Sequence, residues 1–577
     1  MSNILTTPIR ADREYTGLLE AVEKGFRGKS LPILASGLCT GAADALTVCL
    51  CEDSAASRKT PVLIICPEEK ECQRLRRDLE QFGHPSAFFV ARDLTFHNVT
   101  ASREFEHERL KVLSGILSGD YDFVLTTPDV ALGYTMPPSV LRESVIRVDY
   151  DTRTEPARLA ERLIAAGFSR VDMVEGAGQF ALRGGIVDVY APNGEFKTSD
   201  GDARHGAFPL RIEFFDDEID RMSIFDAETQ RSTVNVREAT FTPARELLVT
   251  AEVRDRLEKA IRARFRESHD EKVCETLTRE IAALSGELSE VSFVDKYISL
   301  VYPEKCSLLD YFDEKTLVIV RSTAAVSDRI KAEKWHENEM IKELVAGGTL
   351  SPKYAEYSKS EAALELFFDQ NVTVHLNSLS GGLGGKRLAG MFGFRTRQPV
   401  GYTGNLDLLC EDLVTYQHGG YAVIIMTENE TAAKNLADIL RDADFTPLVT
   451  AGESADGEKF DSKLVYITWK KSLSGYELIT PRVAVISTEA VARRADFTPR
   501  ARAAQDAKSV TTQGRSCPTP SLTRAISSST KYTVSVAISD LKRSRSTESP
   551  ENTSAYSTQA RISSVCPLKS SISCRNI

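Results

Sequence analysis

The chain has 577 residues, a formal net charge of −10 at pH 7 and a hydrophobic content of 42%. This length accommodates several domains, each large enough for its own core. The acidic balance argues against a protein that coats nucleic acid with its whole surface. No apolar run approaches the ~20 residues of a membrane span, and residues 1–13 lack the apolar core of a signal peptide. We therefore expect a cytoplasmic protein of several globular domains, without a membrane partner.

The eleven cysteines are scattered along the chain. Cys49 and Cys51 are the closest pair, and no set of further cysteine or histidine ligands lies nearby. This pattern is typical of reduced cytosolic thiols and argues against a bound metal. We expect no metal site.

Residues 1–150 alternate between strand-like and helix-like patterns. The candidate elements are, in order, a strand at 31–35, a strand at 62–66, a helix at 69–82, a helix at 105–117 and a strand at 123–126. Such βαβ rhythm predicts a parallel sheet with helices on its faces, and therefore an α/β fold.

Residues 178–232 combine strand-like runs with a high density of charge. Residues 186–190 and 210–215 each predict a strand, and the glycines between them predict a hairpin with a long loop. Arg211 and Glu213 are two apart, so their side chains emerge on one face of the sheet. A solvated sheet face explains this charge, and a recognition surface for another protein, anchored by arginine, is the alternative. Nothing in the segment indicates a catalytic residue.

The same segment closely resembles the small inserted module that is shared by the excision-repair protein UvrB and the transcription-repair coupling factors. The matching positions are Gly178, Arg183, Gly184, Asp188, 211–215, 218–220, 225–226 and 229–232. In both families this module is the docking surface for UvrA. The resemblance therefore implies that the UvrA-binding residues are Arg170, Phe180, Arg183, Asp188, Arg211, Glu213 and Phe214. Ser169 departs from the family, which often has arginine there, and this puts one contact in doubt.

The resemblance also locates the loop that holds nucleotide in UvrB, here running from Gly37 through Gly41 to Ala45. A working P-loop needs glycine amides and a lysine for the phosphates, and a hydroxyl for Mg²⁺. Here Asp44 occupies the lysine position and Ala45 the hydroxyl position. A carboxylate repels triphosphate and alanine cannot bind the metal, so we expect nucleotide binding to be lost. This loss favours the coupling factors over UvrB itself.

The predicted domains are a degenerate RecA-like domain in two parts, 1–150 and 241–345, with the UvrA-docking α+β module inserted at 151–240. A linker at 346–400 and a smaller α/β domain at 401–490 follow. The run S-L-S-G-G-L-G-G-K at 378–386 lacks the first glycine and the final hydroxyl of a phosphate loop, which predicts a surface loop.

Residues 491–577 form a tail of different character. From residue 511 onward it is rich in serine and has no phenylalanine or tryptophan, which predicts disorder. Residues 524–539 can be back-translated so that a shifted frame resembles the start of the polymerase-interacting domain of the coupling factors. Our hypothesis is that the tail is out of frame and the chain truncated.

The resemblance covers about residues 1–490 and implies a part in transcription-coupled nucleotide excision repair, with UvrA as the partner of a monomer. In the full family, a C-terminal motor uses ATP and Mg²⁺, binds DNA and displaces RNA polymerase. None of those motor motifs occurs here, so we expect no cofactor in this chain, and enzyme activity stays open. The alternatives are a UvrB-like ATP-dependent helicase subunit, against which Asp44 and Ala45 count, and a non-functional frameshifted product.

Overall fold

The computed structural model describes most of the chain up to residue 487. The described ranges are 2–28, 30–54, 60–92, 103–284, 292–313, 315–399, 402, 406–454, 460–469 and 474–487. The tail for which we predict disorder and an out-of-frame origin lies outside the described residues.

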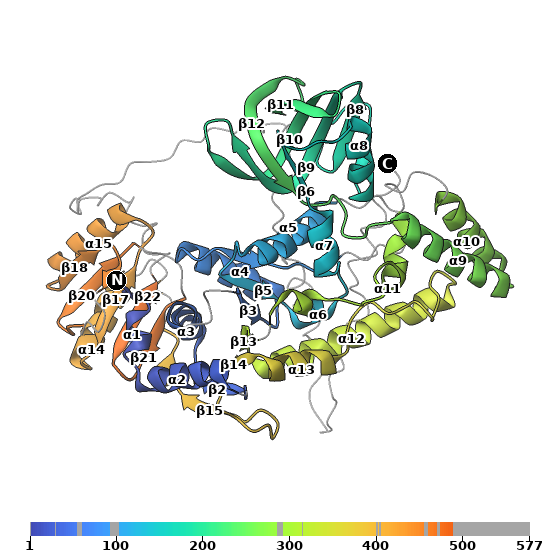
Figure 1. Ribbon diagram of the computed structural model, residues 1–577. Helices are drawn as coiled ribbons and strands as arrows, with labels where there is room; N and C mark the ends of the chain where they lie inside the picture. The colour runs from blue at the N-terminus through green and yellow to red at the C-terminus, as the bar shows by residue number, and fades with distance from the viewer. Residues whose placement is uncertain are drawn as a thin grey trace, which may run out of the picture. The chain divides into compact units, whose positions relative to one another are not determined.

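A seven-stranded sheet organises the first part of the chain, in the order β15-β2-β14-β13-β3-β5-β4, with every neighbouring pair parallel (Figure 1). Its strands are β2 (Ile33–Ser36), β3 (Val62–Ile65), β4 (Ser86–Phe88), β5 (Phe123–Thr126), β13 (Leu317–Arg321), β14 (Val372–Leu376) and β15 (Gly390–Gly393). The helices that follow its first strands are α3 (Thr40–Asp53), α4 (Glu69–Gln81) and α5 (Glu104–Ser118). The parallel sheet predicted from the sequence is confirmed.

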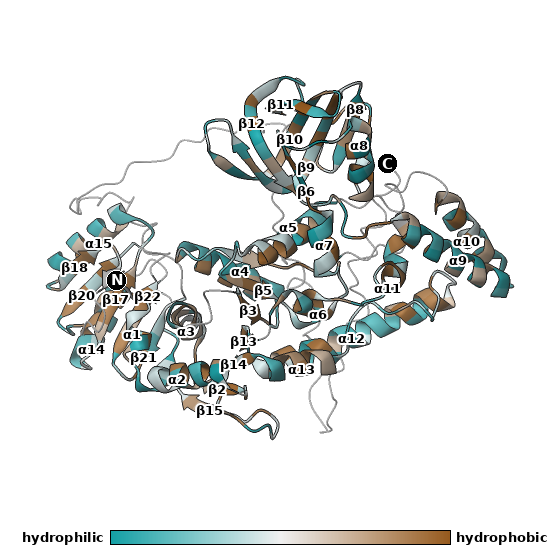
Figure 2. Cartoon of the chain, viewed as in Figure 1, coloured by the Kyte–Doolittle hydropathy of each residue, from teal (hydrophilic) through white to brown (hydrophobic). Residues whose placement is uncertain are grey.

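This sheet is apolar on both faces, as parallel sheets covered by helices are. Along β3, Leu63 and Ile65 pack into one apolar cluster, and Val62 and Ile64 pack into another on the opposite face. Figure 2 shows the result as brown strands at the centre and mixed teal and brown helices around them.

The linker predicted at 346–400 is wrong over much of its length. This range contains α13 (Glu361–Gln370), β14 and β15, and β14 lies between β13 and β2 inside the sheet. Thr373 and His375 interrupt the apolar run of β14, yet both are buried. His375 makes a 3.0 Å hydrogen bond with the hydroxyl of Thr323, a partner that only the fold brings near.

The inserted module is a second seven-stranded sheet, in the order β6-β12-β11-β10-β9-β8-β7, and β12 also pairs with β9 (Figure 1). Its elements are β6 (Ile146–Asp149), α8 (Pro156–Ala165), β7 (Ser169–Arg170), β8 (Gln179–Arg183), β9 (Ile186–Thr198), β10 (Ala203–Phe215), β11 (Glu218–Phe225) and β12 (Ser232–Phe241). All its pairs are antiparallel except β7 with β8. Its apolar core lies between the sheet and α8.

The long loop predicted between the two strands of this hairpin is wrong. Only residues 199–202 connect β9 to β10, because Gly194 and Gly206 lie within the strands instead of in a turn. A Cβ at Gly194 would lie 2.3 Å from the carbonyl oxygen of Thr240, so the glycine marks where the backbone of β12 approaches β9 closely in their pairing. Glycine inside a strand often has this meaning.

Helices flank the module along the chain on both sides. They are α6 (Pro128–Leu132) and α7 (Pro138–Ser144) before the module, and α9 (Ala251–Glu267), α10 (Glu271–Leu284), α11 (Ile298–Val301) and α12 (Thr323–Ala346) after it. Two 3-10 turns lie at Ser292–Tyr297 and Leu308–Tyr311. Their apolar faces share a cluster with one face of the parallel sheet.

The smaller α/β domain has a six-stranded sheet in the order β16-β21-β22-β17-β20-β18. Its elements are β16 (Thr396–Arg397), α14 (Leu406–His418), β17 (Ala422–Met426), α15 (Glu430–Asp442), β18 (Thr446–Thr450), β20 (Leu464–Thr468), β21 (Tyr476–Leu478) and β22 (Val483–Ser487). The N-terminal segment, with β1 (Ser2–Asn3), α1 (Thr7–Arg10) and α2 (Arg13–Arg27), reaches this domain, because β1 pairs with β19 (Glu453–Ser454).

A buried ion pair fixes the chain where it leaves the module. Arg109 of α5 donates hydrogen bonds of 2.9 and 3.0 Å to the two carboxylate oxygens of Glu246. Burial by itself raises the pKa of Glu246, but Arg109 and Arg92 outweigh it and lower the pKa to about 2. The carboxylate therefore stays charged inside the protein and ties the re-entry segment to the parallel-sheet domain.

We expect Glu246→Gln to lower the free energy of unfolding at pH 7 by about 3 kcal/mol, since a buried arginine loses its counter-charge. The folded-state pKa is depressed, so this contribution is present above the unfolded pKa of about 4.3 and is lost as pH falls towards 2. Urea unfolding of the unaltered chain and of Glu246→Gln across this pH range measures the effect. The difference between their free energies of unfolding should become smaller as the pH falls. Glu258→Gln, at an exposed pair with Arg262, is the control, and a gap that persists at low pH would contradict the assignment.

Candidate protein-docking site

Two cross-strand rows of side chains lie on the face of the inserted sheet opposite its main core. The inner row is Ala181, Asp188, Arg211 and Ser223, and the outer row is Arg183, Ile186, Glu213 and Arg221. Residues that pair across an antiparallel sheet have side chains on the same face, so each row is a line of neighbours. The shared face predicted for Arg211 and Glu213 agrees with this register.

The inner row is tied into the module itself. Arg211 donates hydrogen bonds of 2.7 and 2.9 Å to the carboxylate of Asp188 and one of 3.0 Å to the carbonyl of Gln230. Its guanidinium carbon lies 5.0 Å from the centre of the Phe225 ring. The hydrogen bonds to Asp188 raise the pKa of Arg211, although burial opposes this. Both charged groups therefore have internal partners, and their first role is to hold three strands and a turn together.

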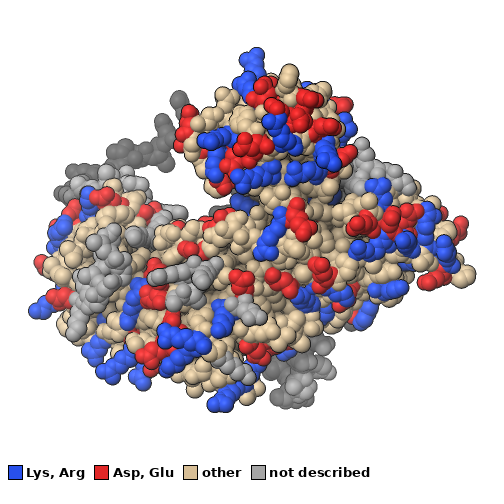
Figure 3. Space-filling view, viewed as in Figure 1, with Lys and Arg blue, Asp and Glu red and all other residues tan. Residues whose placement is uncertain are grey.

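The outer row is open to solvent. Arg183 and Arg221 are exposed, and Ile186 exposes 37% of its surface. Phe215, at the end of β10 beside this row, exposes 77% of its surface, an unusual position for a large aromatic side chain. An apolar centre flanked by charged groups is typical of protein interfaces. Figure 3 shows acidic and basic side chains interspersed over the module.

The structure divides the predicted UvrA-binding residues into three groups. Arg170, Arg183 and Glu213 have solvent-accessible surface, and Asp188 and Arg211 form the internal pair. Phe180 and Phe214 lie on the core side, with Phe180 fully buried and Phe214 packed against the core. A direct contact through Phe180 is therefore ruled out, because the side chain has no exposed surface.

Sequence reasoning missed Ile186, Phe215 and Arg221. The signal for Phe215 was present, since two phenylalanines precede the acidic turn at Asp216 and only one of them can face the core. Alternation along β10 decides which one is exposed, because Phe215 shares a face with Arg211 and Glu213, whereas Phe214 follows Leu210 and Ile212 on the core face. Ser169, where the family often has arginine, accepts a 3.4 Å hydrogen bond from Arg103, which comes from the start of α5.

The predicted nucleotide loop holds an ion cluster of its own. Asp44 is fully buried, and its carboxylate lies 2.7 Å from Arg74 and 2.9 Å from Arg321. Burial, and then the charge of Asp44, raise the pKa of neighbouring Asp78 to about 7. Ala45 is buried in the apolar core. These residues do not fit a nucleotide with Mg²⁺, because the Asp44 side chain is buried in its own ion cluster instead of offering a cation to phosphate, and Ala45 has no hydroxyl to bind the metal.

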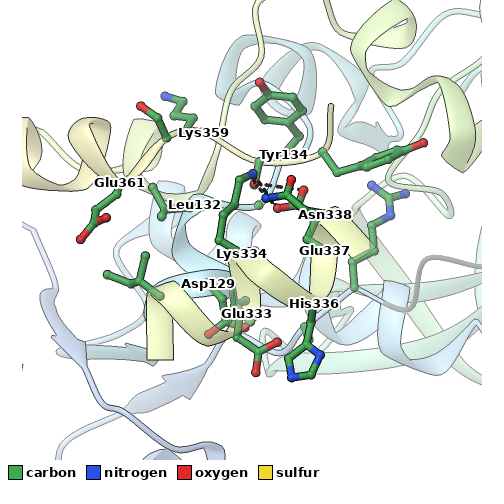
Figure 4. Close-up of a pocket in the computed structure, with 18 of the residues that line it drawn as sticks. Asp129, Leu132, Tyr134, Glu333, Lys334, His336, Glu337, Asn338, Lys359 and Glu361 are labelled. Carbon is green, nitrogen blue, oxygen red and sulfur yellow. Dashed lines mark hydrogen bonds and ion pairs between the residues drawn. The ribbon is translucent and has the colours of Figure 1, made fainter. Parts of the chain in front are cut away.

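A cavity of about 890 Å³ lies beside α6 and α12, and Figure 4 shows its lining. Several of its charged groups are paired: Lys334 donates a 2.6 Å hydrogen bond to Glu337, and Asp129 accepts one of the same length from Arg329. Across the described residues, no group of His, Cys, Asp and Glu could hold a metal ion.

The sequence of the module matches a known family. Residues 146–247 match the model of the UvrB interaction domain, and this range covers β6 to β12 and the re-entry segment. The inserted module is thus a UvrB interaction domain.

The wider chain is similar to transcription-repair-coupling factors. That of Bacillus subtilis (strain 168) is 25% identical over 508 residues, which is 85% of this chain and 40% of the relative. That of Staphylococcus aureus (strain MRSA252) is 22% identical over 458 residues, 76% of this chain and 36% of the relative. The resemblance inferred from the sequence is confirmed, and the chain spans less than half the length of these curated relatives. No helix in the described ranges is long and apolar enough to span a membrane.

We expect Arg211→Ala to lower the local stability of β9 and β10 by about 2 kcal/mol, because Asp188 is left buried without its partner. Arg221→Ala, in the exposed outer row, should change it by less than about 0.5 kcal/mol. Native-state hydrogen exchange of these two strands measures both effects. Equal effects of the two substitutions would contradict the division into an internal and an exposed row.

Proposed function

We propose that this chain acts in transcription-coupled nucleotide excision repair, as a docking protein that recruits UvrA through the outer row and Phe215. The observation that carries the proposal is an exposed, charge-flanked apolar patch on a module that matches the UvrB interaction domain. The similarity to transcription-repair-coupling factors supports the process, and the module supports the partner.

The chemistry of the patch supports a protein partner. Phe215 and Ile186 supply apolar area, while Arg183 and Arg221 supply the residue type enriched at interface hot spots. Glu213 adds a negative charge between them, so the patch selects a partner by complementary charge as well as by shape. The internal Asp188–Arg211 pair keeps the strands in register beneath it, which limits the entropy lost on binding.

We propose that ATP hydrolysis, DNA binding and contact with RNA polymerase belong to regions of the relatives beyond the matched part. In this chain the loop at Asp44 does not fit nucleotide, which counts against the alternative of a UvrB-like helicase subunit. The proposed function is therefore binding, in the cytoplasm, without a cofactor of its own.

We expect Phe215→Ser and Arg183→Ala each to weaken UvrA binding by about 2 kcal/mol, roughly thirtyfold, since both remove exposed anchors without removing core contacts. Titration calorimetry of the full chain with purified UvrA measures this. Phe265→Ser is the matched control, because Phe265 exposes 40% of its surface on α9, outside the module. Unchanged affinity in both module variants would contradict the proposed surface, and so would an equal loss in the control.

A further inference from the structure

The loop after β2 is in contact with the smaller α/β domain. The backbone amide of Cys39 donates a 2.7 Å hydrogen bond to the hydroxyl of Thr396, which in turn donates one of 2.8 Å to the carbonyl of Gly37. Thr396 begins β16, a strand of the smaller domain's sheet. A side chain of that domain thus forms hydrogen bonds with both sides of this loop. In a P-loop protein the corresponding loop surrounds phosphate.

Backbone of the smaller domain also covers the first turn of α3. A Cβ at Gly41 would lie 1.8 Å from the carbonyl oxygen of Ser474 and 2.6 Å from that of Gly475, which leaves no room for any side chain. Carbonyl oxygens carry partial negative charge, and the N-terminus of a helix carries partial positive charge. The oxygens of Ser474 and Gly475 therefore lie where a phosphate would otherwise meet the helix.

An apolar contact continues from this point. Tyr476 is fully buried, and its hydroxyl donates a hydrogen bond to the carbonyl of Leu5. Leu478 and Val485 belong to the same apolar cluster as Ala42 of α3 and the apolar residues on one face of the parallel sheet. The smaller domain and the parallel-sheet domain thus share one core instead of meeting across a solvated gap.

We propose that the former nucleotide loop has become an internal docking site, which latches the smaller α/β domain to the parallel-sheet domain. Asp44 in α3 is held by Arg74 and Arg321, and backbone of Phe394, Ser474 and Gly475 lies against Gly37 and Gly41 of the loop and the first turn of the helix. The latch is independent of nucleotide, so the two domains move as one body. This inference does not depend on the proposed binding of UvrA.

The test is hydrogen exchange, followed by mass spectrometry, on the full chain. Alanine is the better helix former, and Gly41 has no positive φ in this helix, so Gly41→Ala opposes the latch by steric contact alone. We expect amide exchange in β21 and β22 to become about tenfold faster. A tenfold change corresponds to the loss of the net stabilisation that one to two hydrogen bonds provide. Exchange in β3 and β5 should stay unchanged.

Gly382→Ala is the matched control, because a Cβ there meets nothing within 4 Å. Thr396→Val, which removes the hydroxyl at nearly constant volume, should act in the same direction as Gly41→Ala and more weakly. Addition of ATP and Mg²⁺ to the unaltered chain should leave exchange in the first turn of α3 as it was. The proposal is overturned if Gly41→Ala leaves β21 and β22 protected, or if ATP alters exchange in α3.

Discussion

The buried carboxylate of Asp44 is the constraint around which the parallel-sheet domain is organised. It lies between Arg74 of α4 and Arg321 at the end of β13, so it joins elements that are far apart in the sequence. A buried charge is tolerated only when it is paired, and both arginines share Asp44 while each also pairs with a second carboxylate, Arg74 with Asp78 and Arg321 with Glu71. The fold thus retains a charge cluster at the carboxyl edge of the strands, where related folds hold a ligand.

The inserted module combines an exposed apolar patch with a stable sheet. One face of its sheet packs on α8, and the other carries the inner row and the outer row. The Asp188–Arg211 pair stabilises the sheet from the exposed side, so that Phe215 and Ile186 can remain uncovered. The internal ion pair and the proposed binding patch therefore lie on neighbouring residues of a single face.

The parallel sheet could be predicted because strands buried on both faces are continuous apolar runs, as at 62–66. β14 could not, since His375 finds its partner, Thr323, only in the folded chain. The hairpin of the module was predictable, but its loop length was not. Gly194 is a residue type typical of turns, and its place in a strand depends on the close approach of β12, which lies more than thirty residues further along.

The sequence could predict which segment of the chain contains the candidate site, but not which of its side chains are exposed. The resemblance identified Arg183, Arg211 and Glu213. Only the structure shows that Arg211 pairs with Asp188 inside the module and that Phe180 is buried in the core. The face of Phe215 follows from the alternation that also places Arg211 and Glu213, but its 77% exposure depends on what the folded module leaves uncovered beside it.

The measurement that tests this account most directly is the free energy of unfolding of Asp44→Asn, from urea titration of the full chain at pH 7. Asparagine keeps the shape and removes the charge, which leaves Arg74 and Arg321 without their shared partner. The account predicts a loss of about 3 kcal/mol or more, with no recovery when ATP and Mg²⁺ are added. A variant as stable as the unaltered chain, or one that nucleotide stabilises, would contradict it.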